Sequence, residues 1–480
     1  MRNQHRSIVE RWVITGKLIL ESPAHFGNGE ADALNDMPIL FGEVDGKPLL
    51  PGTSIAGALR NYLREREFGY GIKEEENSPA SLLFGGFRGD DEGAQSPLIV
   101  YDAIGKSAGL ELRDGVAINP ATRTAIDEKK FDIQLLAAGS TFDLRFELLV
   151  NGKEKNSQEL RDALFTALSG LENQQITLGA RKGRGFGKCT CSNWKVQKYD
   201  LTDKGQLKAW LSSERNWVDM PGVNSQPGQT IGEMLTANIL QNDLRENAIL
   251  SATFSIDGTL LIRSGFGSSD DGPDTVHLHS KRSGNEKPVP VIPGTSWAGI
   301  LRHRALKIAR TVSNNKEKSQ SFIDNMFGPS EIKKNDRDTK ASRVRIQESQ
   351  VYGSIPMVMT RVKIDRFTGG AFESALFGEQ PEIGKLGDKN VRLDLNLQNP
   401  TEAETGLLLL LLKDLWTGDL PVGGESSVGR GRLKGVTAIL EAMGNEWNFK
   451  AEKNDGLTIT PESKTLQGFV TAFKDEMVGA

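Results

Sequence analysis

Two glycine- and arginine-rich segments carry the residues needed to bind phosphate groups. The first, GRGFGK at 183–188, follows Arg181 and Lys182 directly and has no acidic residue among its cations. Glycines let backbone N–H groups approach a phosphate closely, and arginines add charge and forked hydrogen bonds. The second, GRGRLK at 429–434, offers the same residue types. The phosphate contacts predicted here come from Arg181, Lys182, Gly183, Arg184, Gly185, Gly429, Arg430, Gly431 and Arg432, with an ordinary surface turn as the alternative.

A second kind of phosphate-binding element precedes each of these segments. PGTSIAGALR begins at Pro51 and PGTSWAGILR begins at Pro293, with eight of ten positions identical. Each motif predicts a helix start, where free backbone N–H groups and the positive end of the helix dipole attract anions. Simple capping of the helix by hydroxyl groups needs the same residues and is the alternative. The predicted contacts are Thr53, Ser54, Thr295 and Ser296.

The motifs recur because the chain contains an internal repeat. The paired landmarks are Pro51 and Pro293, Phe84 and Phe327, Ile118 and Ile364, and Gly183 and Gly429, separated by 242, 243, 246 and 246 residues. Chance does not keep four landmarks in register over such a distance, so the chain is read as two tandem copies. The predicted domains are 1–200 and 245–480, joined by a linker at 201–244 that includes a stretch rich in proline and glycine.

Both copies show the same expected order of elements. A β-type run opens each copy, at 11–20 and 249–263, and the PGTS helix follows with apolar residues at helical spacing. Strand-like segments come next, with long excursions at 118–139 and 364–387. A second apolar helix and a final strand close each copy. This order predicts an α+β fold with helices on one face of an antiparallel sheet.

Composition limits the class of protein. A chain of 480 residues exceeds one ordinary core, and the net charge of −4 requires any RNA-binding cations to be concentrated on one face. The longest apolar run, 407–412, fits a buried helix rather than a membrane span, and the N-terminus has no apolar signal region. Cys189 and Cys191 form no zinc pattern and are poorly spaced for a disulfide. A cytoplasmic protein without a membrane partner is expected.

These motifs resemble the RAMP superfamily. The Gly-rich loop after a helix is similar to its signature loop, and AHFGNGEADALNDMPILFGEVDGKPLLPGTSIAGALR at 24–60 resembles the backbone subunits of type III CRISPR effectors. The resemblance implies two ferredoxin-like, RRM-like domains fused as in type III-D variants. It also implies RNA contacts for Arg60 and Arg302. The implied partners are crRNA, complementary target RNA, and neighbouring backbone, small and large subunits.

The two excursions correspond to the thumb hairpin of this family. In relatives the thumb reaches across the guide–target duplex and displaces one base pair per subunit, which produces a six-nucleotide repeat. Such a wedge needs an apolar tip backed by basic residues, because unstacking bases costs free energy. Ordinary solvated hairpins are the alternative. The residues of these types are Arg123, Lys129, Lys130 and Phe131 in the first copy and Arg361, Lys363, Arg366 and Phe367 in the second; RNA contacts are predicted for Arg123 and Arg366.

The resemblance also implies chemistry in the loop that follows the first strand. Relatives are thought to cleave RNA through a loop aspartate, by metal-dependent attack of a 2′-hydroxyl on its neighbouring phosphate. Asp36 matches that residue, with Asp32 as a nearby second acid. A carboxylate can hold a divalent metal, here Mg²⁺ or Mn²⁺, or help to deprotonate the hydroxyl.

The loop of the second copy is less regular. If Phe266 is paired with Phe26, the second loop is two residues longer than the first. The position that this pairing makes equivalent to Asp36 then holds no acidic residue. Asp274 lies within the range that the two extra residues allow and is the predicted catalytic and metal-binding residue. Asp270 and Asp271 are rival candidates. An inactive second copy is the alternative. His277 and His279 occur only in this loop and could carry protons.

The leading hypothesis is therefore an RNA-binding backbone subunit that also cleaves target RNA at six-nucleotide intervals, which makes it an endoribonuclease. A catalytically inert crRNA-binding scaffold has the same fold and is the main alternative. A guide-processing endoribonuclease is less favoured, because such relatives rely on a histidine near the Gly-rich loop and no histidine lies near 183 or 429 in the sequence.

Overall fold

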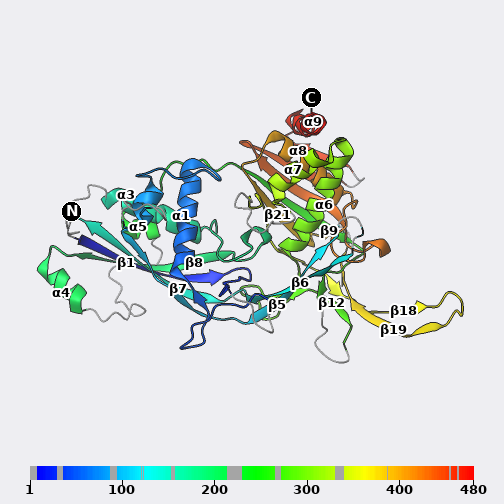
Figure 1. The fold of residues 1–480 in the computed structure, drawn as a ribbon, viewed down its shortest axis with the longest axis horizontal. Helices are drawn as coiled ribbons and strands as arrows, with labels where there is room; N and C mark the ends of the chain where they lie inside the picture. The colour runs from blue at the N-terminus through cyan, green and yellow to red at the C-terminus, as the bar shows by residue number, and fades with distance from the viewer. Residues whose placement is uncertain are drawn as a thin grey trace.

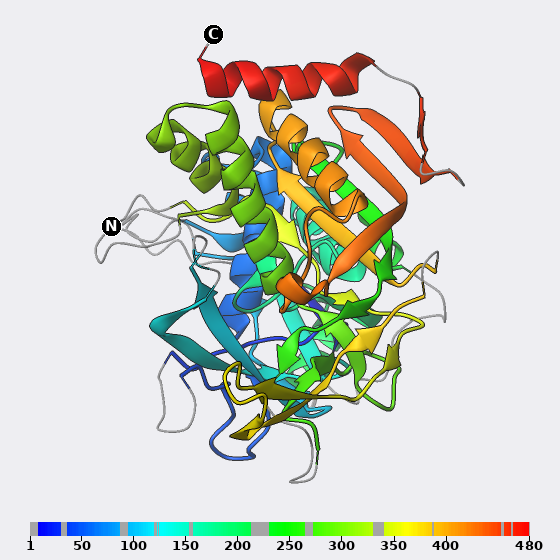
Figure 2. The same ribbon diagram turned by 90° about the vertical axis from the view of Figure 1, so that its right-hand side faces the viewer.

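The structure is a computed structural model, drawn in Figures 1 and 2. It describes residues 8–29, 36–86, 95–119, 122, 124–152, 157–212, 230–264, 272–329, 340–385, 388–452, 456–461 and 464–479. Four of the sequence-predicted site residues or their rivals lie outside the described residues: Asp32, Arg123, Asp270 and Asp271.

The first copy is an antiparallel sheet covered by helices, as predicted (Figure 1). Its strand order is β2-β4-β7-β1-β8, and β3 also pairs with β7. The strands are β1 (Ile8–Leu20), β2 (Leu49–Leu50), β3 (Leu98–Val100), β4 (Ala103–Lys106), β7 (Thr141–Asn151) and β8 (Cys189–Asp200). The helices are α1 (Gly52–Phe68), α2 (Pro79–Phe84) and α3 (Ser157–Glu172). Their apolar faces and the covered face of the sheet form one core.

The second copy repeats this arrangement and extends it. Its strand order is β15-β21-β9-β22-β23-β24. The strands are β9 (Asn247–Asp257), β15 (Val344–Ile346), β21 (Val391–Gln398), β22 (Arg432–Ala442), β23 (Asn445–Ala451) and β24 (Leu457–Thr460). The helices are α6 (Gly294–Val312), α7 (Lys316–Phe327), α8 (Glu402–Trp416) and α9 (Lys464–Val478). The mixed α+β prediction is confirmed in both copies.

A C-terminal addition, formed by β23, β24 and α9, distinguishes the second copy. Figure 2 shows α9 lying across the end of α8. The two helices meet at Gly406, where a Cβ atom would lie 2.0 Å from the carbonyl oxygen of Phe469, so only glycine permits this approach. Phe469 and Phe473 are buried in the second core. The addition therefore completes the core that the repeat alone would leave open on this side.

The leucine run at 407–412 lies in α8, as expected, and its members contribute to the second core. A capping box starts this helix, because Thr401 accepts a hydrogen bond from the backbone of Glu404 and the Glu404 side chain bonds back to Thr401. Among the described residues, no helix is long and apolar enough to cross a membrane.

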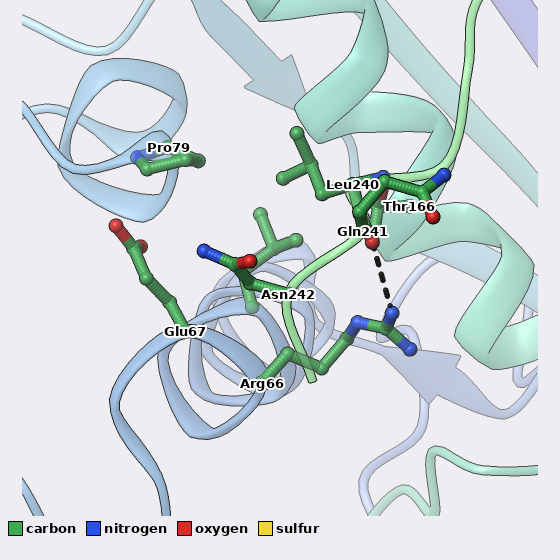
Figure 3. A pocket seen from close by; sticks show the side chains of 8 residues that line it. Arg66, Glu67, Pro79, Thr166, Leu240, Gln241 and Asn242 are labelled. Atoms are coloured by element: carbon green, nitrogen blue, oxygen red, sulfur yellow. Dashed lines mark hydrogen bonds between the residues drawn. The ribbon is translucent and has the colours of Figure 1, made fainter. Parts of the chain in front are cut away.

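Part of the predicted linker is built into the first copy. It contains α4 (Lys204–Ser212) and α5 (Ile231–Leu235), and both Ile231 and Leu235 are buried in the first core. Beyond α5, Arg66 of α1 donates a hydrogen bond to the carbonyl oxygen of Leu240 at 3.1 Å. A small cavity of about 190 Å³ lies beside this contact, and no sequence-predicted site residue lines it (Figure 3).

Each excursion is a long antiparallel hairpin. The hairpins are β5 (Leu110–Ile118) with β6 (Ala125–Leu136), and β18 (Met359–Ile364) with β19 (Ala371–Gln380). Both first strands therefore include residues before the predicted start of the excursions. In Figure 1 the β5–β6 hairpin lies at the junction of the copies, whereas β18–β19 projects away from the body.

Short strands support the loops around these hairpins. They are β10 (Thr259–Leu260), β11 (Arg263–Ser264), β12 (Thr275–His277), β13 (His279–Ser280), β14 (Val289–Ile292), β16 (Ser349–Gln350), β17 (Ile355–Pro356) and β20 (Glu382–Ile383). The strand β12 pairs in parallel with β19 and so ties the loop of the second copy to its hairpin.

Candidate functional site

The structure places Asp36 and Asp274 at equivalent positions. The Oδ2 atom of Asp36 accepts a hydrogen bond from the backbone N–H of Asp132 at 2.9 Å, and Oδ2 of Asp274 accepts one from the N–H of Gly378 at 2.7 Å. The residue after each aspartate pairs in parallel with the second hairpin strand, Met37 with Ile133 and Thr275 with Glu379. Each copy therefore holds one loop aspartate against the base of its hairpin.

The two aspartates differ in their surroundings. In the first copy, Asp132 lies opposite Asp114 across the hairpin. A hydrogen bond with Asp114 raises the pKa of Asp132, followed by partial desolvation and the charge of Asp114, with a further contribution from Asp36. The corresponding pair in the second copy is Gly378 and Thr360. Asp36 thus belongs to an acidic trio, whereas neither corresponding position beside Asp274 is acidic.

The described carboxylates do not form a ready metal centre. Asp36, Asp114 and Asp132 have the hard oxygen donors that Mg²⁺ and Mn²⁺ prefer. Nevertheless, no group of three or more His, Cys, Asp or Glu side chains in the described part of the chain is arranged to hold a metal ion. Any divalent ion at Asp36 or Asp274 would therefore need ligands from outside this set.

The histidines near the loops are held by backbone groups. His25 is buried and its Nδ1 lies 2.8 Å from the carbonyl oxygen of Gln134. His277 is also buried, and its Nε2 lies 3.0 Å from the carbonyl oxygen of Val291. Burial, followed by the charge of His279, lowers the pKa of His277 to about 4. The suggestion that His277 carries protons is corrected, because its ring is enclosed and already bonded.

Hydrogen bonds also correct the alignment of the repeat. Leu178 N–H donates to Gly187 O at 2.9 Å, and Val422 N–H donates to Gly431 O at 2.9 Å. The Gly-Arg loops are thus offset by 244 residues rather than 246, so GFG at 185–187 corresponds to GRG at 429–431. The pairing of Phe26 with Phe266 would set His25 against Gly265 in the sequence. The hydrogen bonds instead match His25 with Leu261, because their carbonyl groups accept equivalent bonds from residues 180 and 424. The two copies therefore share no histidine at this position.

This shift changes the role of Arg430. Arg430 takes the place of the apolar Phe186 and is 2% exposed. Its guanidinium contacts Glu379 at 2.8 Å and Glu425 at 3.0 Å. The side chain is therefore enclosed in an internal ion pair, and the RNA contact of Arg430 stays a prediction. Gly429 and Arg432 are exposed, whereas Gly431 is buried.

The other predicted cation of the loop, Arg181, lies beside the loop aspartate of the first copy. Its guanidinium carbon lies 4.3 Å from the centre of the Phe131 ring, and its Nη2 lies 3.9 Å from the sulfur of Met37. Burial lowers the pKa of Arg181. Phe131 is therefore at the base of its hairpin rather than at an apolar tip. In the other hairpin, Phe367 lies at the tip next to exposed Arg366 and is itself 99% exposed.

Both PGTS helices begin at proline, and neither motif caps its own helix with a side chain. Because no Thr or Ser side chain caps either helix, the capping alternative is wrong. Thr53, Ser54 and Thr295 are exposed, and Ser296 is partly exposed. In the first copy, the first helical N–H, that of Gly52, donates to Oδ1 of Asp102 at 2.6 Å.

Arg60 and Arg302 make equivalent structural contacts, one in each copy. Arg60 donates to the carbonyl oxygen of Gly85 at 3.0 Å, and Arg302 donates to the corresponding carbonyl of Gly328 at 2.5 Å. Each also pairs with an acid of its own copy, Glu74 or Asp324. These bonds hold the end of the short second helix, a role that the sequence did not indicate.

The Gly-Arg loop of the first copy docks onto the PGTS helix of the second. The loop turn, Lys182–Arg184, lies against the start of α6 and the end of β15. A Cβ atom on Gly294 would lie 2.3 Å from the carbonyl oxygen of Arg184, and one on Gly185 would lie 2.4 Å from the backbone nitrogen of Glu348. Both glycines are needed because backbones from the two copies meet here.

This docking gathers four cations from both copies, here called the junction cluster: Lys182, Arg184, Arg302 and Arg345. Burial, then the charges of Arg302 and Arg181, lowers the pKa of Arg184. Desolvation at the junction and repulsion from Arg345 lower the pKa of Lys182, with a partial offset from Glu65. Arg345 thus disfavours the charged form of Lys182, and Arg302 and Arg181 disfavour that of Arg184, which is the electrostatic condition that favours a bound anion.

A buried ion network fixes the junction in place. Glu348 of the second copy contacts Arg113 of β5 at 2.7 Å and Arg282 of its own copy at 2.7 Å. Glu111 of β5 accepts hydrogen bonds from Ser280 at 3.1 Å and from the backbone N–H of Lys281 at 2.8 Å. Although burial raises the pKa of Glu348, Arg113 and Arg282 lower it to about 2. No sequence pattern singled out these residues, because Glu348 and Arg113, and likewise Glu111 and Ser280, come from different copies.

Comparison with known proteins agrees with the repeat. The RAMP superfamily model matches residues 17–190 and 254–434, one region in each copy. The chain is also similar to the CRISPR system Cms endoribonuclease Csm3 of Streptococcus thermophilus, with 24% identity over 211 residues, which is 40% of this chain and 94% of that protein. The resemblance inferred from the motifs is thus confirmed at the level of the family. This chain belongs to the RAMP superfamily.

Proposed function

We propose that the chain is a backbone subunit of a type III CRISPR ribonucleoprotein and that it binds crRNA and the guide–target duplex. Family membership supports this function, as does similarity to an endoribonuclease of such a system over nearly its whole length. The observation that carries the proposal is the junction cluster, in which two copies of an RNA-binding type of domain bring their cations to one point.

The junction has the features of a phosphate site. The exposed hydroxyl of Thr295 lies in the first turn of α6, where the helix dipole attracts anions. The loop turn that carries Lys182 and Arg184 packs against α6 and β15 from the first copy. Neither loop residue forms an ion pair with an acid in the described structure, so a phosphate group would supply the missing negative charge. An RNA strand crossing from one copy to the next would meet this point.

The first copy provides a contrast. Its corresponding helix start, in α1, already has the carboxylate of Asp102 on the N–H of Gly52. The equivalent of Asp102 is Glu348, since each lies two residues after the corresponding strand end, Val100 or Ile346. Glu348 is turned into the ion network with Arg113 instead. The α6 start thus lies against the basic loop turn of the other copy, whereas the α1 start already binds a carboxylate.

We further propose that the loop aspartates cleave the target strand at six-nucleotide intervals. Asp36 and Asp274 occupy one equivalent position in each copy, and a backbone N–H orients each carboxylate through Oδ2. A carboxylate so oriented can accept the proton of a ribose 2′-hydroxyl as that oxygen attacks the adjacent phosphate. The hairpin that supplies the N–H is the element proposed to displace a base and bend the strand into position.

A divalent metal, Mg²⁺ or Mn²⁺, is proposed as cofactor, with Asp36 and Asp274 as candidate ligands. The ion would stabilise the negative charge that develops on the phosphate. Because the described side chains do not form a complete site, water and the RNA phosphate would provide the other ligands. Cleavage in the presence of a chelator would contradict this part of the proposal.

The inert-scaffold alternative is separated from cleavage by aspartate variants. A guide-processing function has less support, because His25, the histidine whose backbone touches the Gly-rich loop, is buried with its ring bonded to Gln134. The proposed partners remain crRNA, target RNA and other effector subunits.

Reversing the charge of the junction cluster tests the RNA-binding proposal. In a Lys182→Glu, Arg184→Glu variant, we expect the dissociation constant for crRNA to rise roughly 10- to 100-fold, because two phosphate contacts become repulsive. The slope of log affinity against log salt should fall by roughly one to two, as expected when two phosphate contacts are lost. Fluorescence anisotropy over a salt series measures both quantities.

The matched control is Lys464→Glu, Lys474→Glu. It makes the same change in net charge on α9, which lies outside both family-matched regions. Equal loss of affinity in the two double variants would mean that only net charge matters and would overturn the assignment of the junction.

A further inference from the structure

A small cavity in the first copy is lined by none of the residues proposed to bind RNA. It lies between α1, α2, α3 and the linker segment that follows α5, and its volume is about 190 Å³ (Figure 3). Part of its wall is apolar and consists of Leu63, Pro79 and Leu240. The polar part includes Glu67 and Asn242. An apolar wall with a few polar groups is typical of a site for a small ligand.

The wall contributed by the linker is held in place by hydrogen bonds. The backbone N–H of Leu240 donates to Oγ1 of Thr166 on α3 at 3.0 Å, and the N–H of Leu244 donates to the carbonyl oxygen of Arg66 on α1 at 2.7 Å. The Arg66 guanidinium donates to the carbonyl oxygen of Leu240 at 3.1 Å and pairs with Asp243 at 2.9 Å. The protein's own contacts therefore form this wall, and they already balance the charge of Arg66.

Glu67 brings a carboxylate oxygen without a partner to the cavity. Figure 3 shows its side chain extending from α1 toward Pro79. Oε2 of Glu67 is buried and has no hydrogen-bond partner in the described part of the chain. Pro79, the first residue of α2, has no N–H to donate. Because a buried oxygen without a donor costs free energy, a ligand that supplies a donor would be stabilised here.

The surroundings of Glu67 favour a positively charged donor. Burial raises the pKa of Glu67, and the charges of Glu74 and Glu75 raise it further. Glu74 already pairs with Arg60, whereas Glu75 is exposed. A cation beside Glu67 would offset both the burial of its carboxylate and the repulsion from its neighbours. The cavity therefore favours a cation over an anion.

The composition of the wall narrows the kind of cation. Of the described residues, Glu67 alone brings a carboxylate to the wall, whereas a divalent metal ion requires several oxygen ligands. A guanidinium group is matched best by two oxygens at once, and of the two Glu67 oxygens Oε2 is the buried one without a partner. A primary ammonium group needs one strong acceptor at a time. Methylene groups behind it would cover the apolar part of the wall.

We propose that this cavity binds a linear alkyl diamine, with one primary ammonium group on Glu67 and the methylene chain against Leu63, Pro79 and Leu240. The second ammonium group remains in solvent, in the negative field of exposed Glu75. Because the cavity lies between α1 and the linker segment, the bound diamine holds that segment to the first copy. This role is independent of RNA binding and of cleavage.

Isothermal titration calorimetry of the RNA-free full chain with cadaverine tests the site. We expect one cadaverine per chain, with a dissociation constant on the order of 0.1 mM. Glu67→Gln keeps the shape of the side chain but removes its charge, so it should raise the dissociation constant at least about tenfold. Glu159→Gln, the same change at an exposed position on α3 that does not line the cavity, is the control and should bind normally. Circular dichroism checks that both variants are folded.

Two further measurements identify the ligand chemistry and the place of binding. Pentanediol has the same chain without the charge and should bind at least about tenfold more weakly than cadaverine. With cadaverine present, the amides of Leu240 and Leu244 should exchange hydrogen at least about twofold more slowly, while those of β24 should not change.

Any of four results would overturn the proposal. They are absence of binding at about 10 mM cadaverine, equal affinities of the Glu67→Gln and Glu159→Gln chains, equal affinities for cadaverine and pentanediol, and unchanged exchange at Leu240 and Leu244. Because RNA is absent from all these measurements, their outcome is separate from that of the RNA-binding and cleavage tests.

Discussion

Replacing Asp36 by asparagine is expected to slow cleavage of the target strand beside the first copy by about 10²- to 10⁴-fold, the usual contribution of a general acid or base. Asparagine has nearly the same shape and keeps an oxygen for the N–H of Asp132, which Asp36 accepts at 2.9 Å. It lacks the charge and the basicity of the carboxylate. The loop should therefore keep its conformation while the chemistry is lost.

Cut positions on a labelled target in the assembled complex measure this effect. Asp36→Asn should remove one cut and Asp274→Asn the cut six nucleotides away, with RNA affinity unchanged in both. Asp45→Asn is the control and should cut normally, because Asp45 is an exposed loop acid that pairs with Lys47, two residues away. If Asp36→Asn cuts as fast as the unmodified chain, the inert-scaffold hypothesis replaces the cleavage proposal. If Asp36→Asn removes one cut and Asp274→Asn removes none, the second copy is inactive.

The second large effect is expected at the ion network of the junction. Glu348→Ala should lower the free energy of unfolding by about 3–5 kcal/mol, because removing one partner of a buried pair leaves the other charges uncompensated. Glu348 and Arg113 are both nearly fully buried, at 2.7 Å, and they belong to different copies. The loss should therefore also let the two copies unfold in separate transitions. Urea denaturation followed by fluorescence measures both results.

A surface ion pair provides the comparison. Lys198 contacts Glu10 at 2.6 Å but is 43% exposed, so Lys198→Ala should cost less than about 1 kcal/mol. A Glu348→Ala chain that is as stable as Lys198→Ala, and that unfolds in the same transition as the unmodified chain, would contradict the importance of the buried network.

Acid should abolish the contribution of Glu348. Its pKa is lowered to about 2 in the folded chain, below its usual value of 4.5. For a carboxyl group with a depressed folded pKa, the stabilisation is present above the unfolded pKa and is lost as the pH falls toward the folded pKa. The stability difference between the unmodified chain and Glu348→Gln should therefore be full above about pH 4.5 and shrink as the pH approaches about 2. A difference that stays constant over this range would contradict the assignment.

Much of the architecture could be predicted from short sequence patterns. The PGTS motif predicted the starts of α1 and α6, and the leucine run predicted buried α8. These are local properties: helical spacing of apolar residues and helix-starting residues act over a few positions. The repeat then extended each local prediction to a second place in the chain.

The loop of the second copy shows where sequence alignment fails. An insertion before Asp274 left three acids, Asp270, Asp271 and Asp274, as possible equivalents of Asp36. Pairing of the following residue with the hairpin identified Asp274, because a hydrogen bond to Gly378 requires one register of the loop against the strand. Such a bond joins residues 104 positions apart, beyond the reach of local pattern.

By itself the sequence determined that this protein is a tandem α+β repeat of the RAMP type, with basic glycine loops and candidate aspartates in its first loops. Only the tertiary structure decided that Arg430 is internal, that the turn carrying Lys182 and Arg184 packs against a helix of the other copy, and that Glu348 joins the copies. The physical reason is the range of the interactions. Secondary structure depends on neighbours a few residues away, whereas the charge state and accessibility of a side chain depend on partners such as Arg113 and Glu348, which are 235 residues apart.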